Sequence, residues 1–184
     1  MPSGPGTLTD AEIAAIVPHV PPPVATFLLT SETRAADIIK HHSRVHTNTI
    51  QLVDALADDA YPALRAALPS VKIVQVVHVT GAEAVDEALR IAPLVDALLL
   101  DSGNPNLSVK QLGGTGRTHD WQLSRRIVDQ SDTPVFLAGG LNAENVQRAI
   151  AEVQPHGVDL CSGIRANGRL DERKLAGFFQ AVGR

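Results

Sequence analysis

Cysteine is almost absent from this sequence, and Cys161 is the only one among its 184 residues. A single cysteine excludes an internal disulfide and any metal site built from several cysteines. The chain has no apolar stretch of membrane-spanning length, and its first residues contain no charged segment leading into a hydrophobic one. We therefore expect no membrane association and a cytoplasmic location.

Runs of basic residues are also missing. The formal net charge is −4 at pH 7, which argues against nucleic acid as a partner. A phosphate group would therefore have to be held by local backbone groups. The 44% of hydrophobic and 20% of charged residues are ordinary for a globular protein. The length allows one sizeable core, so we predict a single domain over residues 1–184.

The chain repeats one pattern, in which a short apolar run is followed by small residues and an amphipathic segment. The apolar runs are predicted to be buried parallel strands, and they cover residues 24–29, 49–53, 72–77, 97–100, 134–138 and 158–161. A lone helix is predicted before them at 11–17, and the later helices are predicted at about 30–42, 58–68, 81–91, after 118, 143–153 and after 171.

Six strand and helix pairs predict an α/β fold of the (β/α)8 TIM-barrel type that is incomplete. A closed barrel of this kind needs eight strands and usually about 250 residues, with about 200 as a lower limit. Six parallel strands would leave unpaired edges that expose apolar surface and free backbone groups. We expect either that another chain covers this gap or that the start of the protein is missing.

The segment 97–121 carries the first candidate functional group. Asp101 ends a short apolar strand, which places it at the functional rim of a parallel sheet, although an aspartate at a strand end is often only a turn former. A glycine-rich loop follows at Gly113, Gly114 and Gly116, where the backbone can come close to a ligand. Thr118 then stands where a helix N-cap belongs.

Small residues follow two successive strands later in the chain, at Gly139-Gly140 and at Ser162-Gly163. Turns of this kind let backbone N–H groups point at an anion. In a (β/α)8 barrel, the loops after strands seven and eight are the usual phosphate site. Close packing of a strand on a helix is the alternative explanation for each glycine pair.

The histidines are weaker candidates. His41 and His42 are adjacent on a predicted helix and point in different directions, so we expect ordinary surface residues and no metal site. His78 ends a predicted strand and would suit a general base if it faced the rim. A histidine in such a place is more often a hydrogen-bonded structural residue.

Three strings in the chain resemble the phosphoribosylanthranilate isomerase family of tryptophan biosynthesis: LLLDSGNPNLSVKQLGGTGRTHDW, PVFLAGGLNAENV and GVDLCSGIRANGRLDERKLAGFF. The resemblance is specific from Ala97 onward and looser before it. It implies a (β/α)8 barrel that carries out an Amadori rearrangement of an N-linked aminoaldose phosphate, without a cofactor. The implied partner is a small phosphorylated sugar substrate, and a homodimer is left open.

The resemblance also implies roles for individual residues. Asp101 would be the general acid that protonates the furanose ring oxygen, and its position after a triple leucine run would suit a pKa raised by desolvation. Asp159 would help to orient the sugar hydroxyls. The phosphate would be held by Gly139, Gly140, Ser162 and Gly163, and the loop of Gly113, Gly114, Thr115 and Gly116 would cover the substrate.

The chain departs from the family pattern in three places. It has no Lys-x-Cys-Gly segment, whose cysteine is the family's base, and Cys161 on the last strand cannot be given that role. The family's Ser-Pro-Arg segment corresponds to residues 4–6, which read Gly-Pro-Gly, and its histidine after Gln-Leu falls at Val53. His78 and Asp54 are the first candidates for a substitute base.

These departures leave two main hypotheses. The first is an isomerase whose sequence lacks its opening β-α-β segment. The second is a shortened, catalytically silent relative that binds a sugar phosphate or completes its barrel with a partner chain. A third hypothesis is another phosphate-binding barrel enzyme, such as an indole-glycerol-phosphate synthase or a pentose-phosphate epimerase. This hypothesis predicts a lysine or metal ligands at strand ends, which the sequence does not show.

Overall fold

A computed structural model of the protein describes residues 7–103 and 118–183. Its main element is one sheet of six parallel strands in the order β1-β2-β3-β4-β5-β6. The strand bounds are β1 Phe27–Thr30, β2 Thr49–Leu52, β3 Lys72–His78, β4 Ala97–Asp101, β5 Val135–Leu137 and β6 Gly157–Val158. Each strand pairs in parallel with the next one along the chain, which confirms the predicted parallel α/β architecture.

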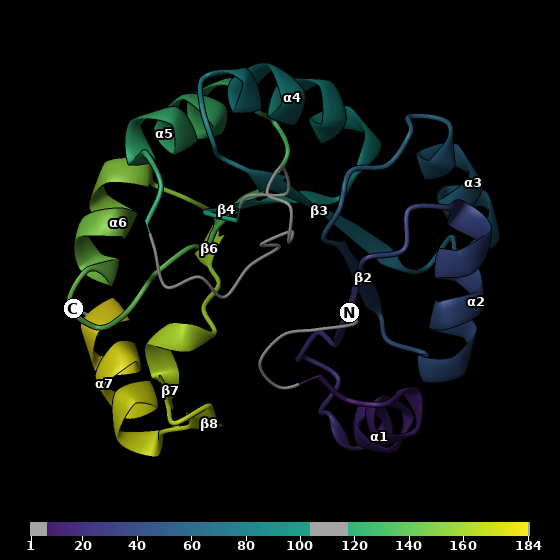
Figure 1. Ribbon diagram of the computed structural model, residues 1–184, viewed down its shortest axis with the longest axis horizontal. Coiled ribbons are helices and arrows are strands. Elements are labelled where there is room, and N and C mark those ends of the chain that lie inside the picture. The colour runs from purple at the N-terminus through teal and green to yellow at the C-terminus, as the bar shows by residue number, and fades with distance from the viewer. Residues whose placement is uncertain (1–6, 104–117, 184) are drawn as a thin grey trace.

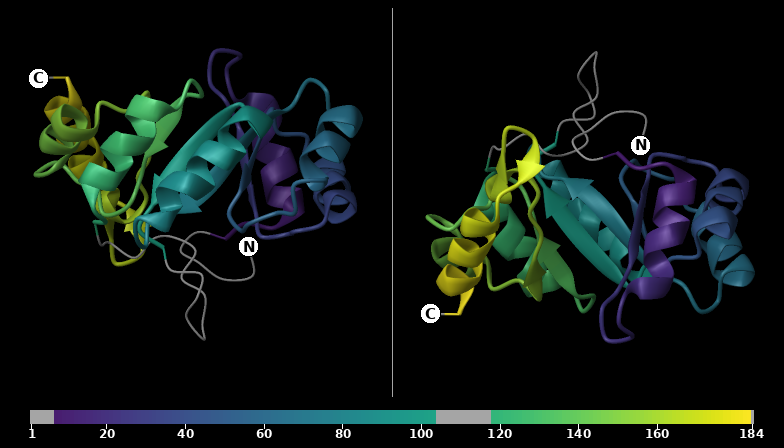
Figure 2. Two further views of the ribbon diagram at one scale, coloured as in Figure 1. Left: turned by 90° about the horizontal axis from the view of Figure 1, so that it is seen from above. Right: turned by 90° about the horizontal axis from the view of Figure 1, so that it is seen from below.

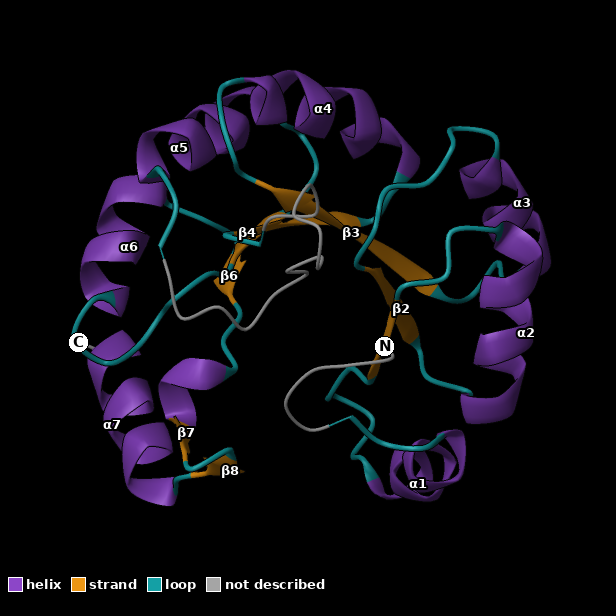
Figure 3. Ribbon diagram, viewed as in Figure 1, coloured by secondary structure: helices purple, strands orange, loops and turns teal. Residues whose placement is uncertain are grey.

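Helices cover the outer side of this sheet (Figure 3). The α-helices are α1 Asp10–Ile16, α2 Ala35–Val45, α3 Ala60–Ala67, α4 Glu83–Ile91, α5 Trp121–Gln130, α6 Val146–Val153 and α7 Glu172–Val182. Short 3₁₀ helices lie at η1 Val17–His19, η2 Ala92–Leu94 and η3 Ser162–Ile164. None of the helices in residues 7–103 and 118–183 is long and apolar enough to cross a membrane.

The sheet and its helices form an arc that is open between α1 and the end of the chain (Figure 1). Among the described residues, β1 pairs only with β2 and β6 only with β5. The inward side chains of β1 consequently lack cover, and Phe27 and Leu29 are each 41% exposed. This exposure confirms the prediction that unpaired sheet edges leave apolar surface open. The view from below looks into this opening, between the yellow α7 and the purple α1 (Figure 2, right).

The central strands β2, β3 and β4 are buried on both faces, largely by two separate apolar clusters. Successive residues of a strand point to opposite faces. One set, which includes Ile73 and Leu98, packs with helix residues such as Ile127 in the larger cluster. The alternate set forms a smaller cluster inside the arc, made of Val53, Val74, Val76, Ala97, Leu99 and Ala138 with Phe136 beside it. Fully burying one such side chain contributes about 1.5–3 kcal/mol, so the larger cluster supplies most of the cohesion.

The first strand starts three residues later than the sequence predicts. We expected it at Val24, but it begins at Phe27. Thr26 explains the difference, because its backbone N–H donates to the side-chain oxygen of Asn48 at 2.8 Å instead of to a neighbouring strand. The Thr26 hydroxyl in turn accepts from the backbone N–H of Asn48 at 3.0 Å. Side-chain hydrogen bonds of this kind compete with the sheet ladder.

Several helix starts also differ from expectation. Thr118 is not the cap of α5, whose N-cap is Asp120 with its side chain accepting from Gln122 N. Asn142 does not directly precede α6 but forms a turn, accepting from the backbone N–H groups of Glu144 and Asn145. The last helix, α7, begins directly after residue 171 as predicted, and Asp171 is its N-cap.

The prediction that His41 and His42 are ordinary surface residues is wrong. His42 is buried, and its Nε2 lies 2.7 Å from the carbonyl oxygen of Thr47. His46 in a left-handed conformation ends α2 and turns the chain back toward this histidine. His41 bridges the Thr30 hydroxyl on β1 and the Asp10 carboxylate on α1. Both histidines therefore join elements together.

A small antiparallel hairpin near the end of the chain was not expected from the sequence. It pairs β7 Arg165–Ala166 with β8 Arg169–Leu170. Asn167 and Gly168 between the two strands both have positive φ, as a tight hairpin turn requires.

Candidate active site

The carboxyl ends of β4, β5 and β6 meet at one edge of the sheet, because parallel strands all end on the same side. The strand register pairs Leu100 with Leu137, and Leu137 with Val158. The residues that follow on the three strands therefore stand side by side. Backbone hydrogen bonds continue this pairing from Ala138 N to Leu100 O at 2.7 Å and from Asp159 N to Leu137 O at 2.9 Å.

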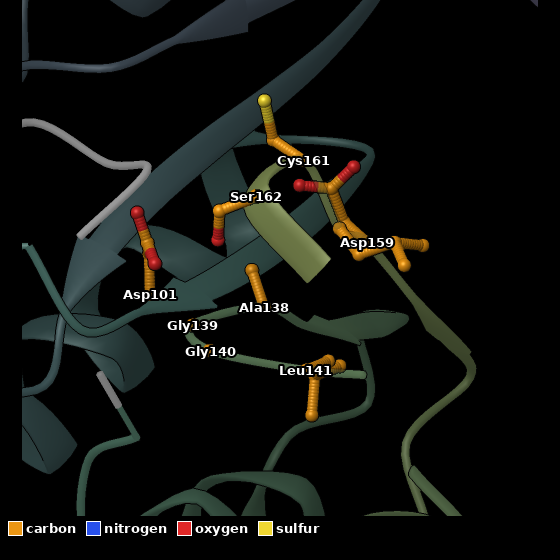
Figure 4. A pocket seen from close by; sticks show the side chains of 9 residues that line it. Asp101, Ala138, Gly139, Gly140, Leu141, Asp159, Cys161 and Ser162 are labelled. Carbon is orange, nitrogen blue, oxygen red and sulfur yellow. The ribbon is translucent and has the colours of Figure 1, made fainter. Parts of the chain in front are cut away.

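A pocket of about 40 Å³ opens at this edge (Figure 4). A single water needs about 10–15 Å³, so the pocket has room for a group of a few heavy atoms. Asp101 and Asp159 lie on either side of Ser162 in this view, with the Gly139-Gly140 turn below them. The lining residues are Asp101, Ala138, Gly139, Gly140, Leu141, Asp159, Leu160, Cys161 and Ser162.

Five residues singled out from the sequence thus line one pocket, namely Asp101, Gly139, Gly140, Asp159 and Ser162. Gly163 lies directly behind the pocket, against the backbone of Leu141. The predicted covering loop, Gly113, Gly114, Thr115 and Gly116, lies outside the described residues.

The Gly139-Gly140 turn depends on the absence of side chains. Both glycines have positive φ, 86° and 66°, a region that other residues rarely adopt. A Cβ on Gly139 would also lie 2.9 Å from the backbone nitrogen of Ser102, the residue that follows Asp101. Glycine therefore lets the turn after β5 pack directly against the end of β4.

Gly163 holds the second turn against the first. A Cβ at this position would lie 2.0 Å from the carbonyl oxygen of Leu141, well inside any real contact. The turn after β6 can therefore approach the turn after β5 only if residue 163 is glycine. This close approach brings backbone groups of both turns to the pocket, as a site for an oxyanion requires.

Asp101 is the most deeply buried acid of the pocket. Its residue is 8% exposed, and its Oδ1 accepts a hydrogen bond from the Ser102 backbone N–H at 2.7 Å. Burial raises the pKa of this carboxyl, while the Ser102 N–H and the nearby His78 counteract part of that rise. A carboxylic acid whose pKa moves up toward neutrality suits a proton donor.

Asp159 is the second acid of the pocket, and it reaches solvent. Its surroundings raise its pKa, first by desolvation and then through the negative charge of Asp101, while a hydrogen bond from the Leu160 N–H opposes the rise. Two carboxyl groups that influence each other disfavour double ionisation. The pocket can therefore hold a proton and offer it to a bound oxygen atom.

The sequence patterns did not predict all the residues that line the pocket. Cys161 lines the pocket between Asp159 and Ser162, although sequence reasoning only excluded it as the base. Its place within VDLCSG, between two predicted site residues, could have indicated this. The thiol points away from the Gly139-Gly140 turn (Figure 4). Leu141 and Leu160 supply apolar walls that no motif indicates.

The two candidates for a substitute base do not line the pocket. His78 ends β3 beside Asp101, and its Nε2 lies 3.2 Å from the carbonyl oxygen of Val53. Asp54 follows β2, and its Oδ1 accepts from the backbone N–H of Ala55 at 3.0 Å. Within residues 7–103 and 118–183, no group of three or more His, Cys, Asp or Glu side chains could hold a metal ion.

Comparison with known proteins places this chain in a family. The family model of N-(5'-phosphoribosyl)anthranilate (PRA) isomerase matches residues 7–181. N-(5'-phosphoribosyl)anthranilate isomerase 2 of Methanosarcina mazei is 37% identical over 164 residues, which cover 89% of this chain and 72% of that protein. The Nostoc punctiforme isomerase is 35% identical over 185 residues, covering 100% of this chain and 85% of the relative.

Solved structures agree with the sequence relatives. The phosphoribosyl anthranilate isomerase of Thermotoga maritima superposes with a TM-score of 0.80 at 27% identity, over 100% of this chain and 85% of that one. Another isomerase structure, a complex with reduced 1-(o-carboxyphenylamino)-1-deoxyribulose 5-phosphate, also has a TM-score of 0.80 at 24% identity, covering 100% of this chain and 84% of that one. These likenesses confirm the predicted TIM-barrel type of fold. The chain belongs to the N-(5'-phosphoribosyl)anthranilate isomerase family.

Proposed function

We propose that the chain catalyses the family reaction through the pocket at the ends of β4, β5 and β6. The substrate is N-(5-phosphoribosyl)anthranilate, and the product is the carboxyphenylamino-deoxyribulose phosphate of tryptophan biosynthesis. The observation that supports this most directly is the juxtaposition of the buried acid Asp101 with the two glycine turns. An acid and an oxyanion-sized space in one pocket are what a phosphorylated aminoaldose needs.

In this proposal, Asp101 donates its proton to the furanose ring oxygen. The bond between this oxygen and the anomeric carbon then breaks, and its electron pair stays on the oxygen, which becomes a hydroxyl group. The nitrogen lone pair forms a protonated imine with the anomeric carbon. A base then removes the proton from C2 to give an enolamine, and protonation of C1 with loss of the proton from the C2 hydroxyl gives the aminoketose. The two protons gained, at the ring oxygen and at C1, equal the two lost, from C2 and its hydroxyl group, so the rearrangement has no net gain or loss of atoms. Burial favours the neutral form of Asp101 before the reaction, as a donor requires.

The remaining pocket residues hold the substrate. Gly139, Gly140, Ser162 and Gly163 surround the space that the phosphate would occupy, and their backbone N–H groups would donate to its oxygens. Asp159 accepts hydrogen bonds from sugar hydroxyls. We assign residues 113–116 to the cover of the bound substrate by resemblance to the family motif, and we take the reaction to need no cofactor.

We also propose a cytoplasmic enzyme and a single domain over the whole chain. A homodimer is proposed because one structural relative, a Thermotoga maritima isomerase, is described as a dimeric protein from which monomers were generated. The oligomeric state can be measured directly by light scattering at several protein concentrations.

The test is turnover of N-(5-phosphoribosyl)anthranilate by the purified chain and by Asp101→Asn. We expect kcat to fall about 10²–10⁴-fold in the variant, since it removes a general acid. The same variant should be more stable than the parent at neutral pH. The raised pKa of Asp101 means that the folded state binds its proton more tightly, so ionisation above the unfolded pKa costs stability.

Asp96→Asn is the matched control, because Asp96 precedes the same strand at its opposite end. Its carboxylate accepts hydrogen bonds from Lys72 Nζ at 3.1 Å and from the backbone N–H of Ile73 at 2.8 Å. This variant should lose stability and keep kcat. A parent chain that binds phosphate but shows no turnover would favour the alternative, a catalytically silent sugar-phosphate binder. Equal turnover by the parent and Asp101→Asn would refute the role of Asp101.

A further inference from the structure

His78 lies next to Asp101 but has no place in the pocket lining or in the family motifs quoted above. It is the last residue of β3, and the strand register pairs it with Asp101, the last residue of β4. Val74 and Val76, two and four residues earlier, belong to the inner cluster together with Leu99. Alternation along the strands therefore points His78 and Asp101 to the same, inner face of the sheet.

The hydrogen bonding of His78 defines its chemical state. Its Nε2 lies 3.2 Å from the carbonyl oxygen of Val53. A carbonyl oxygen can only accept a hydrogen bond, so Nε2 carries the hydrogen. The neutral ring then has its lone pair on Nδ1. This atom is buried and has no hydrogen-bond partner among the described residues. A buried polar atom without a partner is costly and calls for an explanation.

We propose that His78 is a positioning residue for Asp101. The carbonyl oxygen of Val53 holds its ring in place, and its unpartnered Nδ1 is the atom that accepts a proton. Protonation of Nδ1 gives an imidazolium, and its charge balances the negative charge that Asp101 acquires when it gives its proton to the substrate. This inference rests on the proposed role of Asp101 as the acid. It does not require His78 to touch the substrate.

The electrostatic surroundings support this pairing. His78 acts to lower the pKa of Asp101 against the effect of burial. Asp159 is a second carboxyl group of the pocket, and the negative charge of Asp101 raises its pKa. The segments that follow the neighbouring strands carry Asp54 and Glu83, which accept hydrogen bonds from Ala55 N and from the Thr80 hydroxyl. Residues 138–141 after β5 contain no titratable side chain. Among the titratable residues named in this paragraph, His78 is thus the only one that can carry a positive charge.

The experiment measures the titration of Asp101 itself and needs no turnover. Aspartate labelled with ¹³C at the carboxyl carbon is followed by NMR from pH 3 to 9 in the full chain, and Asp101→Asn identifies the signal. His78→Gln keeps an N–H that can donate to the Val53 carbonyl but cannot become charged. We expect the midpoint of Asp101 to rise by about one pH unit in this variant, the lower end of the effect of a close opposite charge.

Two further variants separate charge from structure. His78→Lys keeps a positive charge at this position and should hold the Asp101 midpoint at or below its parent value. His156→Gln makes the same substitution next to the start of β6, at the opposite end of the sheet, and should leave the midpoint unchanged. An Asp101 midpoint that moves by less than about 0.2 pH unit in His78→Gln, or that rises as much in His156→Gln, overturns the proposal.

Kinetics give a second readout if the chain turns over substrate. The acid must be protonated to act, so kcat/KM falls as pH rises through its pKa. This descending limb should move to higher pH in His78→Gln, by the same shift as the NMR midpoint. A chain without turnover would refute the proposed function and leave the NMR result for His78 standing, so the two failures are distinguishable.

Discussion

Replacing Gly163 with alanine tests the contact on which the two turns of the pocket depend. An added Cβ would lie 2.0 Å from the carbonyl oxygen of Leu141, and ordinary contact begins at 3.4 Å. The turns must therefore separate by roughly 1.4 Å. Gly163 is not among the glycines with positive φ, so alanine meets no backbone strain there and the contact alone opposes it.

The magnitude follows from the rigidity of the two partners. Both are backbone segments, and overpacking of this kind typically costs about 1–3 kcal/mol. With a urea dependence of about 1–3 kcal/mol per molar, the unfolding midpoint should fall by about 1 M. Displacement of a reacting group by about 1 Å can cost about 10²-fold in rate, so turnover should suffer as well as stability. Inorganic phosphate should stabilise the parent by binding the folded state, and it should stabilise the variant less.

Gly177→Ala is the matched control for this prediction. Gly177 lies within α7, and an added Cβ there would have nothing within 4 Å. Alanine should therefore stabilise the helix by about 0.5–1 kcal/mol and leave phosphate binding unchanged. If Gly163→Ala unfolds at the parent's urea concentration and keeps the full response to phosphate, the two turns do not form one anion site.

Two further predictions concern stability. The pKa of His119 is lowered to about 4 by burial, so the unfolded chain binds this proton more readily, and stability should fall by about 2 kcal/mol between pH 7 and pH 5. Urea unfolding of His119→Phe should show a smaller loss of stability between pH 7 and pH 5 than the parent shows. An equal loss in the two proteins would contradict this prediction. The buried Tyr61 hydroxyl donates to Gln75 Oε1 at 2.9 Å, so Tyr61→Phe should cost about 1–2 kcal/mol without changing kcat. A variant as stable as the parent in urea would show that water replaces this bond.

The middle of the sheet was the most predictable part of the fold. The strands β2, β3 and β4 are buried on both faces. A strand buried in this way has a nearly continuous apolar sequence, which makes it easy to recognise. The end of such a run also marked the position of Asp101 at the rim. The edges were less predictable, because β1 starts where the side chains of Thr26 and Asn48 bond to each other's backbone.

The candidate site was predictable where local backbone chemistry determines it. Gly139 and Gly140 take a conformation that few other residues adopt, so their role in a turn is visible in the sequence. The function of Gly163 depends on the carbonyl oxygen of Leu141, which lies far from it in the chain and has no local signature. The place of Cys161 in the pocket and that of His78 beside Asp101 are likewise tertiary properties that residue type does not encode.

The pocket lies entirely within residues 101–162, whereas the exposed edge of β1 belongs to the other half of the arc (Figure 1). In the proposed function, binding of an anionic ligand is therefore a local property of three consecutive strands. Substitutions near β1 can then accumulate without weakening the binding of that ligand, even where they abolish turnover. In this fold, retention of a ligand by a variant is thus no evidence that the variant still performs chemistry.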